Sequence, residues 1–289
     1  MICDTVCSCN KLFDEKTLHP LVSVIDLSKQ CKREQIRLDC YSMVLRHYPC
    51  KSSMFGRKSY DFSDGTLLFR NPEKSIDIQT GCEHEPSGML LVFHPSLLRC
   101  SYLGQHIKDY TFFRYNPDEA LHLSNTEVQT IKRCLKDIAA ELEWGVDKYS
   151  ATLICNKIEM LLNYCSRYYT RQFITRHDAS TKVMDEVARK IDDYMLNGKI
   201  AVDGMPCACK LAQRMEMSSA YLNDMVRHET GKEFSDYVQL RRVELSKQMI
   251  VSTRKSDDEV ASTLGYCSTG CFRQLFEKLT GMTTNEYRN

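Results

Sequence analysis

The side chains with the most specific chemistry lie in the last third of the chain, where arginine and carboxamide residues occur close together. Arg273 and Gln274 are neighbours, and Asn223 and Arg227 lie one helical turn apart. A guanidinium can donate two hydrogen bonds to N7 and O6 of guanine, and a carboxamide can pair in a similar way with adenine. These residue types indicate recognition of base edges in the DNA major groove, if helices present them to the solvent.

One apolar pattern occurs twice in this part of the chain. The first copy runs from Leu211-Ala212 to Gly231 and the second from Val260-Ala261 to Gly281. Within each copy the apolar residues lie three and four apart, which predicts helices with one buried face. Small polar residues interrupt each copy and suit helix N-caps, and the glycine suits the end of the second helix. Each copy therefore predicts a helix-turn-helix motif.

The second helix of each motif, at about 219–228 and 269–278, is the predicted recognition helix. Lys255, which lies between the motifs, is expected to contact phosphate. Asp224 would repel phosphate, but it could accept from a cytosine amino group or orient a neighbouring side chain. The expected DNA-binding residues are Ser219, Ala220, Asn223, Asp224, Arg227, Lys255, Ser268, Thr269, Gly270, Arg273 and Gln274.

A single helix at 235–251 is predicted to link the two motifs. A helix of this length spans about 25 Å at ~1.5 Å per residue. Successive major grooves on one face of DNA are ~34 Å apart. A motif packed at each end of this helix could therefore enter each of two adjacent grooves.

The end of the chain resembles the AraC/XylS-type transcriptional regulators. Similarity to that family's signature is carried by Gly265-Tyr266, Phe272, Leu275-Phe276 and Gly281-Met282-Thr283-Thr284-Asn285-Glu286-Tyr287-Arg288, and in the first copy by Leu211-Ala212, Tyr221-Leu222-Asn223-Asp224 and Glu229-Thr230-Gly231-Lys232. Thr284 stands where the family usually has Pro, and we expect it to serve as an N-cap. Glu277 stands where Lys is common, so one expected phosphate contact is missing.

Residues 17–115 predict a small β-domain. Short apolar or alternating runs indicate strands at 21–25, 41–45, 67–69, 76–78 and 89–93. Asp64-Gly65 suits a type I′ turn, which predicts a hairpin whose first arm is 59–62. The family resemblance implies a cupin-like barrel that holds an effector pocket. The segment from Phe93-His94-Pro95 to Phe112-Phe113 is similar to one branch of the family.

Two helices are predicted at about 124–169. Ser124 and Glu127 form a capping box at the start of the first helix. Its apolar residues form a narrow seam, namely Val128, Ile131, Leu135, Ile138 and Leu142. Two interpretations of the seam stay open: it packs on the barrel as core, or it forms the dimer contact that the resemblance implies.

The predicted fold class is α+β. Residues 1–170 form a sensing and dimerisation domain, with a cupin-like β-barrel at about 17–115 and the helical pair at about 124–169. The polar segment 171–180 has no apolar periodicity and predicts a linker. Residues 181–289 form an all-α domain in which a linking helix joins two helix-turn-helix motifs.

Neither the histidines nor the 15 cysteines form a pattern typical of a metal site. His47, His84 and His94 are isolated, and the cysteines at 3, 7 and 9 and at 207 and 209 lack a second ligand pair at zinc-finger spacing. Scattered cysteines without a secretion signal predict reduced thiols, namely small buried residues and one Cys near a helix start. We therefore expect no metal, no cofactor and no enzymatic activity, since a cupin-type enzyme would need a metal constellation.

The composition is that of a soluble globular protein, with 43% hydrophobic and 27% charged residues. No apolar run approaches the ~18 residues of a membrane span, so we expect a cytoplasmic protein. From Asp178 to the end, 16 Lys and Arg oppose 17 Asp and Glu, a net charge of −1. DNA-binding domains are usually basic. A helical-repeat scaffold that binds protein partners without DNA readout is therefore the rival hypothesis.

The sequence thus predicts a sequence-specific transcriptional regulator that binds double-stranded DNA. Control is expected through the N-terminal domain, by a small-molecule effector or by the dimer state. Such control requires that the effector bind one arrangement of the domains more tightly than the other. The expected partners are DNA, a second copy of the chain and the effector, with RNA polymerase as a further candidate.

Overall fold

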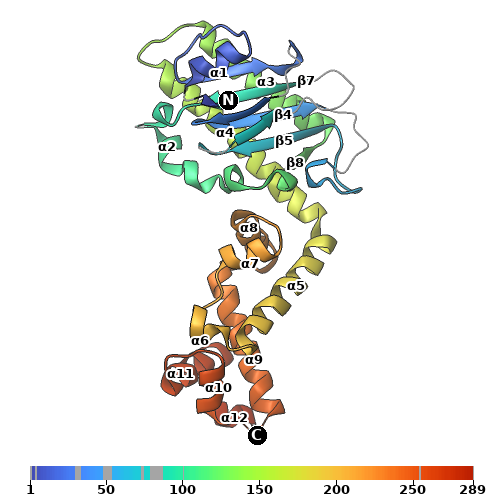
Figure 1. The fold of residues 1–289 in the computed structure, drawn as a ribbon, viewed down its shortest axis with the longest axis vertical. Coiled ribbons are helices and arrows are strands. Elements are labelled where there is room, and N and C mark those ends of the chain that lie inside the picture. Colours follow the sequence, from blue (N-terminus) through green and yellow to red (C-terminus); the bar gives the residue numbers. More distant parts are fainter. Residues whose placement is uncertain are drawn as a thin grey trace. The chain divides into compact units, whose positions relative to one another are not determined.

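The computed structural model describes residues 2–3, 5–29, 34–47, 54–72, 75–78, 87–99, 101–253 and 255–288. His84 lies outside the described residues, as do the side chains of Cys3 and His47. The chain divides into two compact units, Met1–Arg176 and His177–Asn289 (Figure 1).

The N-terminal unit contains an antiparallel sheet of five strands. Their order is β2 (Val22–Asp26), β7 (Ser87–Phe93), β4 (Tyr41–His47), β5 (Gly65–Arg70) and β8 (Leu121–Leu123). Because the edge strands β2 and β8 do not pair among the described residues, this sheet is open and the expected cupin-like barrel is not confirmed. A second sheet has the order β1 (Ile2–Cys3), β3 (Glu34–Leu38) and β6 (Ser75–Ile78).

Both faces of the five-stranded sheet are apolar. On one face Val44 and Leu90 join an apolar cluster that includes Leu38 of β3 and two residues of α1 (Val6–Leu12). Successive side chains of a strand point to opposite faces, so Leu45 faces the other way, where α3 (Asn125–Glu143) packs. The five-stranded sheet therefore lies between α3 on one face and the smaller sheet with α1 on the other.

The predicted hairpin at Asp64-Gly65 is wrong. Residues 59–62 are not a strand, and Gly65 is the first residue of β5, which pairs with β4 and β8. A Cβ atom on Gly65 would lie 2.5 Å from Cγ2 of Val128. Glycine is therefore required here by the close approach of α3 and not by a turn.

Three helices complete the unit: α2 (Tyr102–His106), α3 and α4 (Ser150–Thr175). The predicted capping box of α3 is confirmed, since Glu127 N donates to Ser124 Oγ at 3.4 Å and Ser124 N donates to Glu127 Oε2 at 2.9 Å.

The apolar seam of α3 lies in the core of the single chain. All five of its side chains, those of Val128, Ile131, Leu135, Ile138 and Leu142, are at most 5% exposed. Side chains buried in this way cannot also contact a second copy, so the dimerisation role expected for them is wrong. The core interpretation, which the sequence left open, is the one that the packing supports.

The expected linker at 171–180 is almost entirely helical. α4 continues to Thr175, and α5 (His177–Leu196) begins two residues later. Polar residues of the expected linker segment, at the end of α4, contact other parts of the N-terminal unit. Gln172 Oε1 accepts from His122 N at 2.8 Å, and Arg171 pairs with Glu127 at 2.9 Å. The segment is polar because its side chains satisfy backbone and carboxylate groups, a role that apolar periodicity does not reveal.

The C-terminal unit is entirely helical among its described residues. After α5 come α6 (Lys199–Asp203), α7 (Ala208–Arg214), α8 (Ser219–Thr230), α9 (Phe234–Ser252), α10 (Asp257–Thr263), α11 (Thr269–Thr280) and α12 (Thr284–Arg288). α8 and α11 end at Gly231 and Gly281, whose φ angles of 68° and 75° confirm the predicted helix ends. No described helix is both long and apolar enough to traverse a lipid bilayer.

The cysteines differ in exposure between the units. In the N-terminal unit Cys9, Cys40, Cys134, Cys155 and Cys165 are buried, as expected, and Cys7 is exposed. In the C-terminal unit the expected burial is wrong, because Cys207, Cys209, Cys267 and Cys271 are all exposed, but the expected Cys near a helix start is present. Cys207 caps α7, where its Sγ accepts from Lys210 N at 3.4 Å.

Truncation of the seam should unfold the N-terminal unit and not merely dissociate a dimer. Ile131→Ala should lower the free energy of unfolding by about 2–5 kcal/mol, because it leaves a cavity in the core. Leu153→Ala is the control, because Leu153 is 44% exposed. Urea unfolding followed by circular dichroism measures both. A folded Ile131→Glu variant that sediments as a monomer would contradict the core assignment.

The buried ion pair between Arg176 and Asp61 should be a second determinant of stability. Arg176 donates to Asp61 from Nε at 2.9 Å and from a terminal nitrogen at 2.6 Å, and the Asp61 carboxylate is fully buried. Removal of one partner leaves a buried charge, so Asp61→Ala should cost about 3–5 kcal/mol. Asp64→Ala, at an exposed carboxylate, should cost little in the same unfolding assay.

The pair also predicts a pH dependence. Burial raises the pKa of Asp61, but hydrogen bonds from Arg176 and Lys58 outweigh it, and the pKa is lowered. Because the pKa of Asp61 is lower in the folded state, the pair stabilises the protein when the pH is above ~3.9, the ordinary aspartate pKa. This contribution is lost as the pH falls through the folded-state pKa.

Candidate nucleic-acid interface

The packing of α10 and α11 determines which residues of the second motif face the solvent. Phe272 and Phe276 are fully buried, and their rings contact Tyr266 at 5.0 Å and Tyr287 at 5.4 Å between centroids. Ser268 caps α11 by accepting from Cys271 N at 3.1 Å. The outward residues at the start of α11 are the half-buried Thr269 and the exposed Gly270, Arg273 and Gln274. These are four of the residues expected to bind DNA.

The start of α11 leaves room for a ligand to approach its backbone. A Cβ atom on Gly270 would meet only the Ser268 hydroxyl, at 3.7 Å. Thr269 donates from Oγ1 to Asp258 Oδ1 of α10, which fixes the hydroxyl against the first helix of the motif. Gln274 forms no hydrogen bond with the residues that the structure describes, so its carboxamide remains available.

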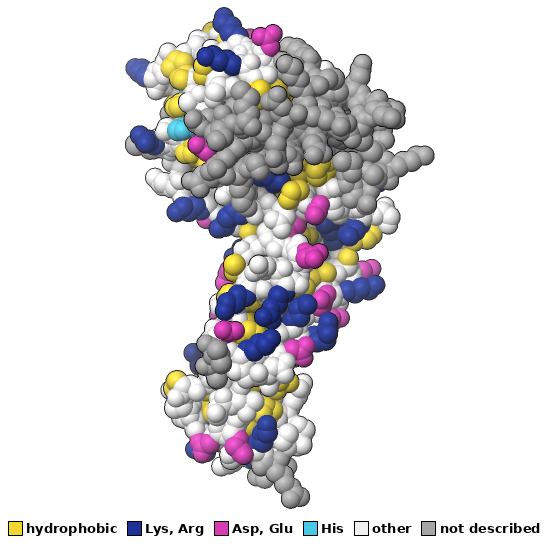
Figure 2. Space-filling model, viewed as in Figure 1, with side chains coloured by type: hydrophobic (Ala, Val, Ile, Leu, Met, Phe, Trp, Pro, Cys, Tyr) yellow, Lys and Arg dark blue, Asp and Glu magenta, His cyan; other side chains and the backbone are white. Residues whose placement is uncertain are grey.

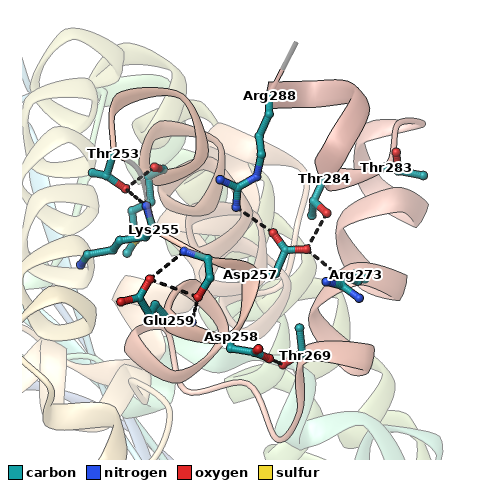
Figure 3. A network of polar contacts seen from close by, with 12 residues as sticks. Thr253, Lys255, Asp257, Asp258, Glu259, Thr269, Arg273, Thr283, Thr284 and Arg288 are labelled. Carbon is teal, nitrogen blue, oxygen red and sulfur yellow. Dashed lines mark hydrogen bonds and ion pairs between the residues drawn. The ribbon is translucent and has the colours of Figure 1, made fainter.

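A buried carboxylate joins three helices of this motif (Figure 3). Asp257, the first residue of α10, accepts from Arg273 Nε at 2.7 Å, from Thr284 Oγ1 at 2.7 Å and from an Arg288 terminal nitrogen at 2.8 Å. We call these four residues the Asp257 cluster. Burial raises the pKa of Asp257, but the hydrogen bonds from Thr284, Arg273 and Arg288 outweigh this effect and lower it. The carboxylate is therefore held in its charged form.

Thr284 does not serve as the N-cap that the sequence suggested. Thr283 caps α12 instead, since Glu286 N donates to Thr283 Oγ1 at 3.2 Å and Thr283 N donates to Glu286 Oε2 at 2.7 Å. Thr284 is 4% exposed and turns its hydroxyl to Asp257. The residue that replaces the usual Pro therefore belongs to the Asp257 cluster.

The first motif offers fewer free side chains than its sequence suggested. Ser218 caps α8, accepting from Tyr221 N at 3.1 Å. Ser219 and Asn223 are half-buried and face outward beside it. Ala220 is only 8% exposed, because it lies on the side of α8 that packs in the core. Its expected DNA contact is therefore wrong.

Arg227 is already paired within the protein. It lies near the C-terminal end of α8 and donates to Glu233 through Nε and a terminal nitrogen, both at 2.8 Å. A further terminal nitrogen donates to Asp224 at 3.2 Å. Asp224 therefore orients Arg227, one of the two roles considered for it. Arg227 is positioned to stabilise the turn after α8, and the prediction that it reads a base is not supported by this geometry.

The linking helix α9 is held by a buried arginine, Arg242. It donates from Nε to Leu264 O at 2.8 Å, and its guanidinium lies 3.4 Å from the Tyr266 ring centroid. Arg242 thus joins α9 to the turn of the second motif. Neither this contact nor those of Asp257 could be found from local spacing, since their partners lie at least 16 residues away.

The basic side chains are interspersed with acidic ones. In Figure 2, Lys and Arg gather on one face of the middle of the C-terminal unit, with Asp and Glu beside them. Lys255 is exposed in the loop before α10 and forms no salt bridge with a described residue. The charge is therefore mixed, with a local basic group and an unpaired lysine beside the second motif.

The described residues contain no group of three or more His, Cys, Asp or Glu side chains that could share a metal ion. His94, one of the isolated histidines, accepts from Ser96 N at 3.1 Å and caps the short helical turn that follows β7. Its role is local and structural.

A family model described as a helix-turn-helix domain matches residues 211–289. The chain is 36% identical over 74 residues to the uncharacterized transcriptional regulatory protein YesN of Bacillus subtilis, a match that covers 25% of this chain and 20% of YesN. It is 29% identical over 79 residues to the regulatory protein SoxS of Escherichia coli, covering 27% of this chain and 74% of SoxS. The chain spans a third or less of the first three Bacillus subtilis relatives that it matches.

Among solved structures, the DNA-binding domain of AdpA in complex with a target DNA is 23% identical, with 35% of this chain and 88% of that chain covered. The TM-score of this match is 0.28. The match of residues 211–289 falls on the two motifs that α7, α8, α10 and α11 form. This part of the chain therefore matches a helix-turn-helix domain, and the match supports its resemblance to the AraC/XylS-type transcriptional regulators.

Proposed function

We propose that this chain is a sequence-specific DNA-binding transcriptional regulator whose second motif supplies most of the base recognition. The observation that carries the proposal is the start of α11, where Arg273 and Gln274 are exposed beside the open backbone of Gly270. These are side chains that pair with guanine and adenine. The helix-turn-helix match over the same segment supports this assignment.

The first motif has a narrower role in this proposal. Asn223 is the remaining candidate for a base contact on α8, because Ala220 is buried and Arg227 is paired. Ser219 and Ser268 are hydroxyl side chains at helix starts, a position that suits contact with phosphate oxygens. The Thr269 hydroxyl already donates to Asp258 and is not available for such a contact. α9 has 19 residues and so spans about 28 Å, which supports placement of the two recognition helices in adjacent grooves.

Control by the N-terminal unit is part of the proposal. Two sheets that pack around one apolar cluster support a cupin-like relationship, although the five-stranded sheet is open. A small-molecule effector, a homodimer and contact with RNA polymerase are proposed partners. A dimer contact would have to use exposed residues in place of the α3 seam, and Trp144 and Met160 are exposed apolar candidates.

One observation favours the rival scaffold function. The C-terminal unit has mixed charge, and Arg227 is neutralised by two carboxylates. Binding of random duplex DNA at several salt concentrations separates the two functions, because phosphate contacts release counterions and make affinity fall as salt rises. A folded protein without measurable affinity for random DNA at low salt would favour the scaffold.

Arg273→Ala should weaken binding to the preferred operator by about 1–3 kcal/mol and relax the preference at one base pair. Arg227→Ala is the matched control: an arginine on the other recognition helix, which we expect to change base preference little because its guanidinium is already paired. Selection from a randomised duplex pool, followed by fluorescence anisotropy, measures both. Equal losses of preference in the two variants would contradict the assignment of base recognition to Arg273.

Lys255→Ala should have a different effect. Loss of one phosphate contact should weaken binding to all sequences alike and reduce the slope of log affinity against log salt by about one unit. Base preference should not change. If Lys255→Ala leaves the salt slope as it was, Lys255 does not contact phosphate.

A further inference from the structure

Arg273 is the exposed arginine of α11, yet one of its nitrogens is already committed. Nε donates to Asp257 at 2.7 Å, while the terminal nitrogens form no hydrogen bond with the described residues. The side chain is 62% exposed, so its end remains available to a ligand. Figure 3 shows Arg273 meeting Asp257 from the side opposite Arg288.

This arrangement restricts a side chain that is otherwise mobile. A free arginine side chain loses rotamer entropy when it is fixed. Because Nε is already bound to a buried carboxylate, part of that ordering takes place on folding and not on binding. The terminal nitrogens retain the donors that guanine N7 and O6 require.

The position of the carboxylate depends in turn on Thr284. Thr284 Oγ1 and Arg273 Nε donate to the same oxygen, Oδ2, while Arg288 donates to Oδ1. Proline, which the resemblance leads one to expect at this position, has no hydroxyl and could not donate to Asp257. The Thr284 contact is therefore a feature of this chain that the resemblance does not supply.

We propose that Asp257, held in place by Thr284, is a positioning residue that sets the base specificity of Arg273. This inference rests on the proposed function and deepens it. The carboxylate has two consequences: it orients the guanidinium for two hydrogen bonds to guanine, and its charge reduces the attraction of Arg273 for phosphate. Asp257 should therefore raise the affinity for the preferred operator but not the affinity for random duplex DNA.

The test compares affinity for the selected operator with affinity for random duplex DNA in the full-length protein. Asp257→Asn should lower the ratio of the two affinities by about tenfold, chiefly by weakening operator binding, with random-duplex affinity unchanged or higher. A merely structural role for Asp257 would lower both affinities together and leave the ratio unchanged. An unchanged ratio would therefore overturn the inference.

A double-mutant cycle makes the test specific for Arg273. In the Arg273→Ala background, Asp257→Asn should cause no further loss of base preference, because the residue that it orients is absent. Additive losses in the double variant would overturn the inference.

Variants of Thr284 keep the test independent of the Asp257 substitution, should that variant fail to fold. Thr284→Val removes the hydroxyl at nearly constant volume and should lower the affinity ratio in the same direction, at the same base pair. Thr284→Ser retains the hydroxyl and should restore the ratio. If Thr284→Val keeps full preference, the inference is wrong. If the unaltered protein shows no sequence preference at all, the proposed function itself is wrong.

Discussion

A buried carboxylate must be hydrogen-bonded to be stable. In the second helix-turn-helix, Asp257 meets this requirement by accepting hydrogen bonds from neighbouring helices, and the packing of the motif depends on these bonds. Its donors come from α11 and α12, which brings three short helices to one point. None of these helices is long enough to be stable alone. Apolar contacts act beside the Asp257 cluster, between the rings of Tyr266, Phe272, Phe276 and Tyr287. The polar and the apolar contacts together determine which face of α11 is exposed to solvent.

The pairing of charges explains how a DNA-binding unit can lack a net positive charge. Arg227 and Arg241 are paired with carboxylates, and Arg242 lies over an aromatic ring in the interior. These arginines stabilise helix contacts and add little to the attraction of phosphate. The exposed positive charges of the second motif and its preceding loop include Lys255, Arg273 and Lys278.

In the N-terminal unit, polar residues at the end of α4 perform a comparable function. Gln172 hydrogen-bonds to the backbone of His122 within β8 and of Ala120 just before it, and Arg176 binds the buried Asp61. Burial lowers the pKa of His122 to about 4, with the charge of Arg176 as a further cause, so the imidazole is neutral at physiological pH. These contacts attach the edge strand of the sheet to the helix that ends the unit.

The sequence by itself determined the elements whose signals are local. Capping at Ser124, the ends of α8 and α11 at glycine, and the repeated apolar spacing of the two motifs were all predictable, because each depends on residues within one or two helical turns. The burial of the α3 seam, the contacts of Arg242 and the Asp257 cluster were decided only by the tertiary structure. An apolar stripe does not reveal which surface covers it, and a charged residue does not reveal its partner. Those partners lie on other elements, up to 31 residues away in the case of Asp257 and Arg288.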